Sequence, residues 1–189
     1  MQAVSDEQLI QWVAEGDVSC LGTLYDRHHE GLFNYCWQLT RNRATSEDLV
    51  QEVFLKLIKK ADSFRGESSF KSWIYLIGRN VAFDHLRREK RQQTDTDREE
   101  TILSGLIDER SAEQGATGQQ DLEHLARSLE SLPVDQREII WLARCEFPDY
   151  RSLADALGCT GQAARVRMHR AMKALHDVFD NLQGGLTNV

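Results

Sequence analysis

The chain has 189 residues, of which 41% are apolar, and a formal net charge of −7, which allows one domain or two small ones with packed cores. Its four cysteines lie far apart with no C-x-x-C pair, so we expect reduced core thiols of a cytoplasmic protein at Cys20, Cys36, Cys145 and Cys159. No stretch is apolar for long enough to span a bilayer, and the first residues lack a basic region followed by an apolar run. We therefore expect no membrane insertion.

The first two predicted helices lie within residues 5–40. Ser5 and Gln8 form a capping-box pattern, and Gly16 is placed to end the first helix. Asp17 is placed to cap the second helix, whose apolar residues follow the helical period to about Thr40. Strand-like alternation is absent from the whole chain, so the sequence predicts an all-α fold.

A third helix is predicted from the capping-box-like pair Thr45 and Asp48. Its apolar stripe comprises Leu49, Val50, Val53, Phe54, Leu57 and Ile58. The opposite face carries carboxylates and amides, among them Asp48, Gln51 and Glu52. The serine-rich segment 62–69 indicates a loop, and four helices with short connections predict a helical bundle.

The fourth helix, which Ser68 or Ser69 is placed to cap, is the most informative stretch. Ile74, Ile77 and Val81 recur at helical spacing and would face a core. Another surface is left with aromatic, amide and basic side chains: Trp73, Arg79, Asn80, Arg87, Arg88, Lys90 and Arg91. Aromatic rings beside a basic stripe suit stacking on unpaired bases while the charges hold phosphate. The alternative interpretation is a solvated amphipathic helix with buried aromatics.

Residues 94–120 are predicted to be a flexible acidic linker between residues 1–93 and a second domain, residues 121–189. From Thr94 to Glu123 nine acidic residues and two arginines give a net charge of −7, so the net charge of the rest of the chain is zero. We therefore expect the chain alone to bind DNA weakly, because the acidic segment repels the backbone that the basic patches attract.

The second domain shows a helix-turn-helix pattern. Pro133 suits the first turn of a helix, Gly158 is placed to end a short helix, and Thr160 is placed to cap the last one. A recognition helix presents its N-terminal residues to base edges, and Gln162 and Arg165 have that position. We expect phosphate contacts from Arg167, Arg170 and Lys173, with packing of their stems on the domain as the alternative. The alternative is a helical domain with a solvated basic helix.

No enzyme is indicated, because no phosphate-binding loop, dinucleotide fingerprint or nucleophile elbow is present. His28-His29-Glu30 could suggest a metal site. Adjacent residues on a helix point about 100° apart, however, so the two histidines cannot share a site without other ligands. We expect a packed His28, a solvated His29 and no metal or other cofactor.

The chain resembles the extracytoplasmic-function (ECF) sigma factors of bacterial RNA polymerase over roughly residues 21–93 and 122–179. In the first domain the matching segments are 47–57 (EDLVQEVFLKL), 64–75 (FRGESSFKSWIY) and 79–88 (RNVAFDHLRR). In the second they are 132–138 (LPVDQRE) and 165–171 (RVRMHRA). The usual Thr-Val pair of the recognition helix is replaced by Ala163 and Ala164, which removes a hydroxyl.

The resemblance implies that residues 1–93 bind core polymerase and recognise and melt the minus-ten promoter element. Docking on the clamp helices of the largest polymerase subunit would use Asp48, Gln51 and Glu52. Phe64, Trp73 and Asn80 would hold unpaired bases. The adjoining DNA backbone would be held by the basic residues that follow on the same helix, Arg87, Arg88, Lys90 and Arg91. The helix-turn-helix would read the minus-thirty-five element. The acidic linker would thread polymerase channels that carry nucleic acid. The resemblance also implies an anti-sigma partner that holds the protein inactive.

Two other functional classes remain open from the residues themselves. One is a stand-alone helix-turn-helix regulator whose first domain senses a ligand or protein, which would bind duplex DNA tightly without polymerase. The other is a protein-interaction module, against which the absence of acidic residues in the last helix before Asp177 counts.

Overall fold

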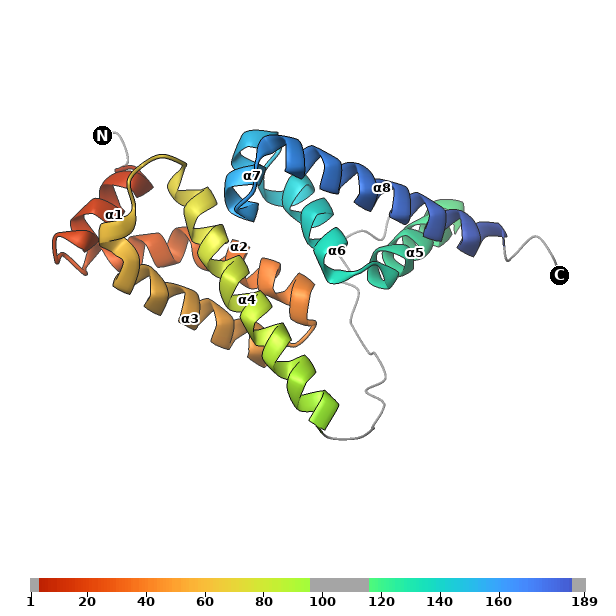
Figure 1. Ribbon diagram of the computed structural model, residues 1–189, viewed down its shortest axis with the longest axis horizontal. Helices are drawn as coiled ribbons and strands as arrows, with labels where there is room; N and C mark the ends of the chain where they lie inside the picture. The colour runs from red at the N-terminus through yellow and green to blue at the C-terminus, as the bar shows by residue number, and fades with distance from the viewer. Residues whose placement is uncertain (1–3, 96–115, 185–189) are drawn as a thin grey trace.

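The structure is a computed structural model that describes the backbone of residues 4–95 and 116–184 and the side chains of residues 4–92 and 123–181. These ranges contain eight α-helices and no strand, so the all-α prediction is confirmed. Figure 1 shows α4 running diagonally between α1, α2 and α3 on one side and the C-terminal helices on the other. In the described part of the chain, no helix is long and apolar enough to cross a membrane.

Four α-helices and one short 3-10 turn make up the N-terminal domain: α1 (Asp6–Ala14), α2 (Cys20–Thr40), α3 (Arg43–Lys60), η1 (Ala61–Ser63) and α4 (Phe70–Asp95). Two of the predicted caps are confirmed. The Ser5 hydroxyl accepts the N–H of Gln8 at 3.2 Å, and the Ser69 hydroxyl accepts the N–H of Ser72 at 3.1 Å. Most of the expected core faces are buried, among them Leu24, Leu32, Val53, Leu57, Phe70, Ile74, Ile77 and Val81. The prediction was wrong for Ile58, at the edge of the apolar stripe of α3, which is 39% exposed.

The predicted starts of α2 and α3 were wrong by a few residues. Asp17 does not cap α2, because its carboxylate accepts the N–H and hydroxyl of Ser19, the residue immediately before the helix. α3 begins at Arg43, and the side chain of Asn42 accepts the N–H of Thr45 at 3.0 Å. Thr45 therefore lies inside the helix that it was expected to cap. Local hydrogen bonding selects among neighbouring polar residues that look equivalent in sequence.

Asn42→Ala is expected to lower the free energy of unfolding by about 1 kcal/mol, because a first-turn N–H of α3 loses its acceptor. Thr45→Ala is the matched control and should change stability by less than about 0.5 kcal/mol, since its side chain caps nothing at this helix start and alanine favours helix. Urea unfolding of both variants measures the difference. A larger loss for Thr45→Ala would contradict the observed start of α3.

The C-terminal domain contains α5 (Ala116–Ser131), α6 (Val134–Trp141), the π-helical turn η2 (Leu142–Glu146), α7 (Tyr150–Leu157) and α8 (Gly161–Gly184). Asp149 caps α7, accepting the N–H groups of Arg151 and Ser152 at 3.0 and 2.8 Å. These bonds hold the pKa of the Asp149 carboxyl below its ordinary value. Gly158 ends α7 in the left-handed region at φ 62°, and Thr160 caps α8, so the predicted helix-turn-helix is present.

The predicted linker, residues 94–120, overlaps both neighbouring helices. α4 extends to Asp95 and α5 begins at Ala116, while residues 96–115 lie outside the described residues. The division of the chain at residues 93 and 121 therefore stays a prediction.

The two domains lie against each other. α7 packs beside the N-terminal half of α4, and α6 packs against α2 (Figure 1). This arrangement brings residues between 59 and 103 positions apart in sequence into direct contact, and it determines which of the predicted site residues are accessible.

Candidate nucleic-acid interface

Three aromatic rings cluster where the loop after η1 meets the start of α4. Phe64 and Trp73 have ring centroids 5.2 Å apart, and each lies 6.1 Å from Phe70. Phe70 is fully buried and holds the cluster in the core, while Phe64 and Trp73 are half-buried. The structure thus brings Phe64 and Trp73 together, with part of each ring accessible for contact with a flat apolar group such as a nucleobase.

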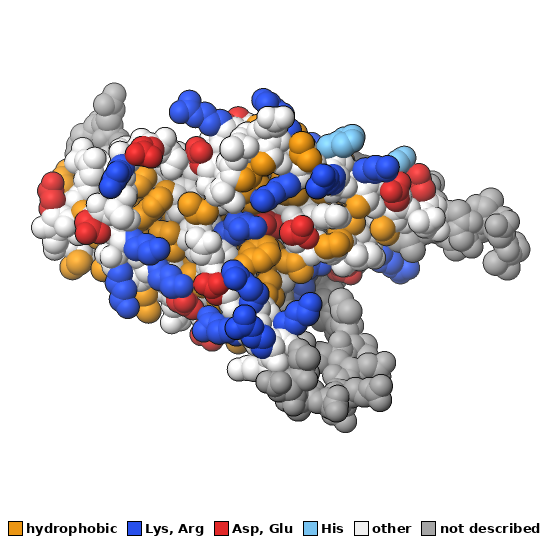
Figure 2. All heavy atoms as spheres, viewed as in Figure 1, with side chains coloured by type: hydrophobic (Ala, Val, Ile, Leu, Met, Phe, Trp, Pro, Cys, Tyr) orange, Lys and Arg blue, Asp and Glu red, His pale blue; other side chains and the backbone are white. Residues whose placement is uncertain are grey.

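Asn80 is exposed seven residues after Trp73, which is two helical turns along the same side of α4. The exposed basic residues of the predicted site follow on the C-terminal part of this helix: Arg87, Arg88, Lys90 and Arg91. Figure 2 shows Lys and Arg side chains gathered over this part of α4 and along α8. Arg87 also pairs with Asp84 at 3.0 Å, an exposed pair that water and salt weaken. One side of α4 therefore offers an aromatic ring, an amide and then positive charge, in that order.

Arg79 has a different environment from the other predicted basic residues. Its Nε lies 3.1 Å from Oε1 of Glu138 in the C-terminal domain, and its guanidinium lies over the ring of Phe83 at 4.6 Å. The Arg79 side chain is 23% exposed. In this arrangement Arg79 faces the C-terminal domain rather than the exposed stripe of Trp73 and Asn80.

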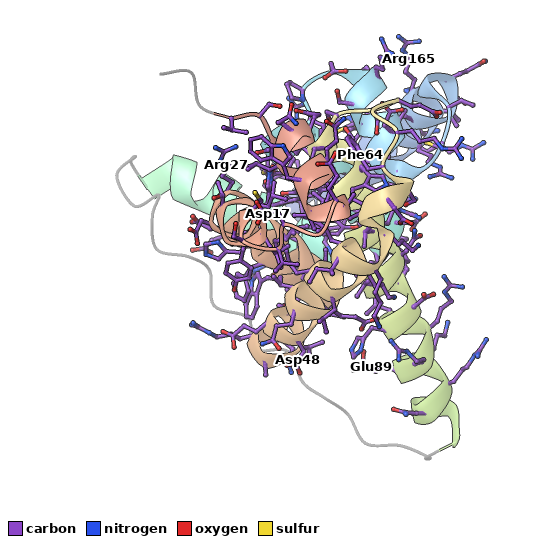
Figure 3. All side chains as sticks on the ribbon, turned by 90° about the vertical axis from the view of Figure 1, so that its left-hand side faces the viewer. Asp17, Arg27, Asp48, Phe64, Glu89 and Arg165 are labelled. Carbon is purple, nitrogen blue, oxygen red and sulfur yellow. The ribbon has the colours of Figure 1, made fainter. Side chains whose placement is uncertain are left out.

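The first turns of α8 expose Gln162 and Arg165. Arg165 lies over the ring of Tyr150 at 5.4 Å, so α7 steadies the side chain expected to read a base. Figure 3 shows Arg165 extending outward at one end of the molecule. The remaining predicted phosphate contacts on α8, Arg167, Arg170 and Lys173, are also exposed.

Arg165→Ala is expected to weaken binding to the cognate promoter by about 1–3 kcal/mol and to relax preference at one base pair. Lys173→Ala is the control, because a phosphate contact should weaken binding to all sequences equally and reduce the salt dependence. Binding measured across single-base promoter variants, in the presence of the core polymerase that the resemblance implies as a partner, separates the two. A loss for Arg165→Ala that is uniform across sequences would reassign that residue to phosphate.

The predicted polymerase-binding residues lie on the outer face of α3. Asp48 and Gln51 are exposed, and Glu52 pairs with Lys56 one turn later at 2.9 Å. Figure 3 shows Asp48 at the opposite end of the view from Arg165. Beside this face, Gln51 and Glu47 help line an open hollow between α2 and α3 with Tyr25 and Phe33. The face is polar and acidic with apolar surface next to it, as suits a basic helical partner.

Two family models match the chain: "Sigma-70 region 2" over residues 24–92 and "Sigma-70, region 4" over residues 122–175. Together they cover more than half of the sequence. Two curated relatives match over most of their length. The ECF RNA polymerase sigma factor SigX of Bacillus subtilis (strain 168) is 27% identical over 85% of this chain and 84% of its own length. The ECF RNA polymerase sigma-E factor of Escherichia coli (strain K12) is 29% identical over 92% of this chain and 94% of its own length.

The chain belongs to the ECF sigma factors.

The solved structures support the same fold for this sigma factor. The sigma factor RpoE of Bartonella quintana, in complex with the anti-sigma factor NepR, has a TM-score of 0.63 and 27% identity over 82% of this chain and 98% of its own. CnrH, in complex with the cytosolic domain of CnrY, has a TM-score of 0.64 and 22% identity over 94% of this chain and 99% of its own. The latter likeness concerns the fold alone.

Sequence reasoning missed a polar cluster within the sigma factor's domain contact. Tyr35 on α2 donates its hydroxyl hydrogen to Oε1 of Glu138 on α6 at 2.6 Å, and Arg79 on α4 approaches both oxygens of the same carboxylate, at 3.1 and 3.3 Å. Only 1% of the Glu138 side chain is exposed. The only signal in the sequence was a charged residue, Glu138, within the apolar pattern of its helix. That signal did not show that Tyr35 and Arg79 would be its partners.

Burial dominates the electrostatics of this cluster. It raises the pKa of the Glu138 carboxyl above its ordinary value, against the opposing effects of Arg79 and of the Tyr35 hydrogen bond. Burial, and next the charge of Glu138, raise the pKa of the Tyr35 hydroxyl well above its ordinary value. Tyr35 therefore stays a hydrogen-bond donor, which is the role that a buried carboxylate requires of its neighbour.

Further contacts join the same two surfaces of the sigma factor. Lys71 pairs with Glu146 at 2.7 Å, and its Nζ also donates to the Glu146 carbonyl at 3.2 Å. The Ser72 hydroxyl donates to the carbonyl of Ser152 at 3.1 Å. The ring of Tyr75 meets that of Phe147 edge to face at 5.2 Å. The domain contact thus combines ion pairs, hydrogen bonds and ring packing on one side of α4.

The two histidines of α2 have separate surroundings. The buried His28 pairs with Asp6 at 2.7 Å, and His29 bonds to the carbonyl of Tyr25 at 2.9 Å. Among the described residues, no group of three or more His, Cys, Asp or Glu could hold a metal ion.

The expectation of core thiols is wrong for one of the four free cysteines. Cys145 is exposed because it lies on the outside of the π-helical turn, whereas Cys36 is buried and Cys20 and Cys159 are half-buried. Burial raises the pKa of the Cys36 thiol to about 12, so this thiol is unreactive at neutral pH.

Proposed function

We propose that this ECF sigma factor binds core RNA polymerase through α3 and directs it to promoters whose two elements are read by the two domains. In this proposal residues 1–93 bind polymerase and melt the minus-ten element, residues 94–120 connect the domains, and residues 121–189 read the minus-thirty-five element. The protein acts in the cytoplasm and carries out no enzymatic step of its own, since polymerase supplies the chemistry.

The order of side chains along one side of α4 supports the melting role most directly. A half-buried Trp73 packed on Phe64 offers a ring for stacking on an unpaired base, and an exposed amide follows at Asn80. Stacking on an aromatic ring is worth about 1–3 kcal/mol per base, which is comparable with the few kcal/mol needed to unstack a base from duplex DNA. The basic C-terminal part of α4 would then hold the adjoining phosphates.

Regulation by an anti-sigma factor is part of the proposal. It is supported by the likeness to a sigma factor that was solved in complex with one, at 27% identity. Such a partner would cover surfaces that bind polymerase.

Run-off transcription with purified core polymerase on a promoter library tests the proposal. We expect transcripts that begin at a shared pair of sequence elements, and only when both the sigma factor and core polymerase are present. A protein that gives no promoter-specific transcript with core polymerase, yet binds one duplex operator tightly alone, would instead be a stand-alone regulator.

A further inference from the structure

The loop between η1 and α4, residues 64–69, contains Phe64, one of the two rings predicted to hold unpaired bases. Four of its six residues are exposed, so the loop has little packing of its own. Gly66 turns the chain with a φ of 70°, in the left-handed region that glycine adopts readily. Such a loop takes its position from the elements that hold its two ends. α1 packs against both of them, η1 before the loop and α4 after it (Figure 1).

Glu7 on α1 joins that helix to the start of α4. Its Oε1 accepts the N–H of Phe70, the first residue of α4, at 3.1 Å. The first N–H groups of a helix have no partner within the helix, and a carboxylate placed there also interacts favourably with the helix dipole. Because Glu7 lies 63 positions before Phe70, this bond connects two separate elements, in addition to the local cap by Ser69.

Asp6, the neighbour of Glu7, reaches the same phenylalanine through a second set of contacts. Its carboxylate pairs with Nε2 of His28 at 2.7 Å and with Nη1 of Arg27 at 2.6 Å, both on α2. The ring of the buried His28 lies 5.2 Å from the ring of Phe70. The first turn of α1 is therefore fixed to α2, and it contacts Phe70 directly at the backbone and, through His28, at the ring.

Phe70 connects α1 to the two rings that are predicted to hold bases. Its ring lies 6.1 Å from that of Phe64 and 6.1 Å from that of Trp73. Phe70 is fully buried in close-packed surroundings, so it cannot shift without moving its neighbours. Stacking on a base depends on where the rings lie, and that position is set by the residues that support them. A change at Glu7 is thus expected to alter the base-holding surface, although Glu7 is not part of it.

We propose that Glu7 is a positioning residue for base capture. By accepting the N–H of Phe70, it holds the loop 64–69 and the rings of Phe64 and Trp73 in the arrangement that takes up unpaired minus-ten bases. The inference rests on the proposed function, because it requires those rings to hold bases. It assigns a part in promoter opening to α1, which lies before the segment that the region 2 family model matches, residues 24–92.

Two variants of Glu7 test this role. Glu7→Ala removes the acceptor, whereas Glu7→Gln keeps a side-chain oxygen that accepts the same N–H. Each is bound to core polymerase, and anisotropy measures the affinity for a fluorescent single strand with the minus-ten sequence of a promoter recovered from the run-off library. We expect Glu7→Ala to weaken this binding about tenfold and Glu7→Gln to stay within about threefold of wild type. Core binding should be unchanged for both.

Asn42→Ala is the matched control for a general loss of stability. It also removes a side-chain acceptor from the first turn of a helix in the same domain, but at α3, away from the contact between α1 and α4. It should leave the affinity for the single strand unchanged.

Combination with Trp73→Ala tests whether Glu7 acts through the rings. Once Trp73 is truncated, Glu7→Ala should weaken binding by less than about threefold further, since the effects of coupled residues do not add. Independent effects would instead give the full tenfold loss on either background.

Hydrogen exchange of the free chain gives a readout that needs neither DNA nor polymerase. Peptides that span residues 64–73 should exchange at least about threefold faster in Glu7→Ala than in wild type, and Glu7→Gln should restore most of the protection. Circular dichroism confirms that the variants are folded.

Unchanged exchange in Glu7→Ala, a loss of single-strand affinity no greater than that of Asn42→Ala, or an undiminished loss on the Trp73→Ala background would each overturn the positioning role. A wild-type complex that does not bind the single strand, or that binds it equally well after Trp73→Ala, would contradict the proposed function and with it base capture. Hydrogen exchange would then still show whether Glu7 holds the start of α4, so the two failures are distinguishable.

Discussion

Reversing two charges on α3, Asp48→Lys together with Glu52→Lys, is expected to weaken binding to core polymerase by about 100-fold. The two residues lie one turn apart on the outer face of α3, where Asp48 is exposed and Glu52 is half-buried beside Lys56. Placing like charges against a basic partner costs several kcal/mol, and about 2.7 kcal/mol corresponds to that factor. Biolayer interferometry with immobilised core polymerase measures the change.

The control for this experiment must match the change in net charge. Glu15→Lys with Asp26→Lys reverses two exposed acidic residues of the same domain outside the predicted surface, and it should alter binding by less than about threefold through long-range effects alone. If both double variants lose affinity equally, net charge rather than the α3 face governs association, and the predicted docking surface is misplaced.

Asn80→Ala and Trp73→Ala are expected to reduce promoter opening by roughly 10- to 100-fold while leaving core binding nearly unchanged. We expect a reduction of this size because each variant loses either one stacked base or one amide contact, which is worth about 1–3 kcal/mol. Permanganate reactivity of thymines in the minus-ten element reports opening, and polymerase affinity is measured in parallel.

The packing of the aromatic cluster makes the two variants unequal. Trp73 contacts Phe64 and Phe70, so its truncation also removes buried ring area, whereas Asn80 is exposed. Trp73→Phe is therefore the informative control, because it keeps a ring for stacking and should recover most of the opening. Equal loss of opening and of core binding in Asn80→Ala would refute the role assigned to this side of α4.

The parts of the fold that short-range chemistry determines could be predicted from sequence. The turn of the helix-turn-helix follows from Gly158, which takes a left-handed backbone conformation that few residues tolerate, and from Thr160, whose hydroxyl caps α8. The core of the N-terminal domain follows from apolar residues at helical spacing, as at Ile74, Ile77 and Val81. Turn and cap chemistry and helical spacing both depend on residues that are close together in the sequence.

The domain contact could not be predicted in the same way. Tyr35 and Glu138 are 103 positions apart, and neither hydrophobic periodicity nor capping rules pair polar residues at that separation. Arg79 shows what this means for the predicted site. The prediction grouped it with the other basic residues of α4 because of its charge, but its position around the helix directs it toward Glu138 on α6. Helical periodicity does separate Arg79 from Asn80 by about 100°, but which side faces another domain is a tertiary property.

The most direct test of the account is the binding of a fluorescent promoter duplex to the isolated chain and to the chain with core polymerase, by anisotropy at physiological salt. We predict weak, sequence-independent binding by the chain alone and promoter-specific binding with core polymerase. Tight, specific binding of the duplex by the chain alone, unchanged by core polymerase, would contradict the account.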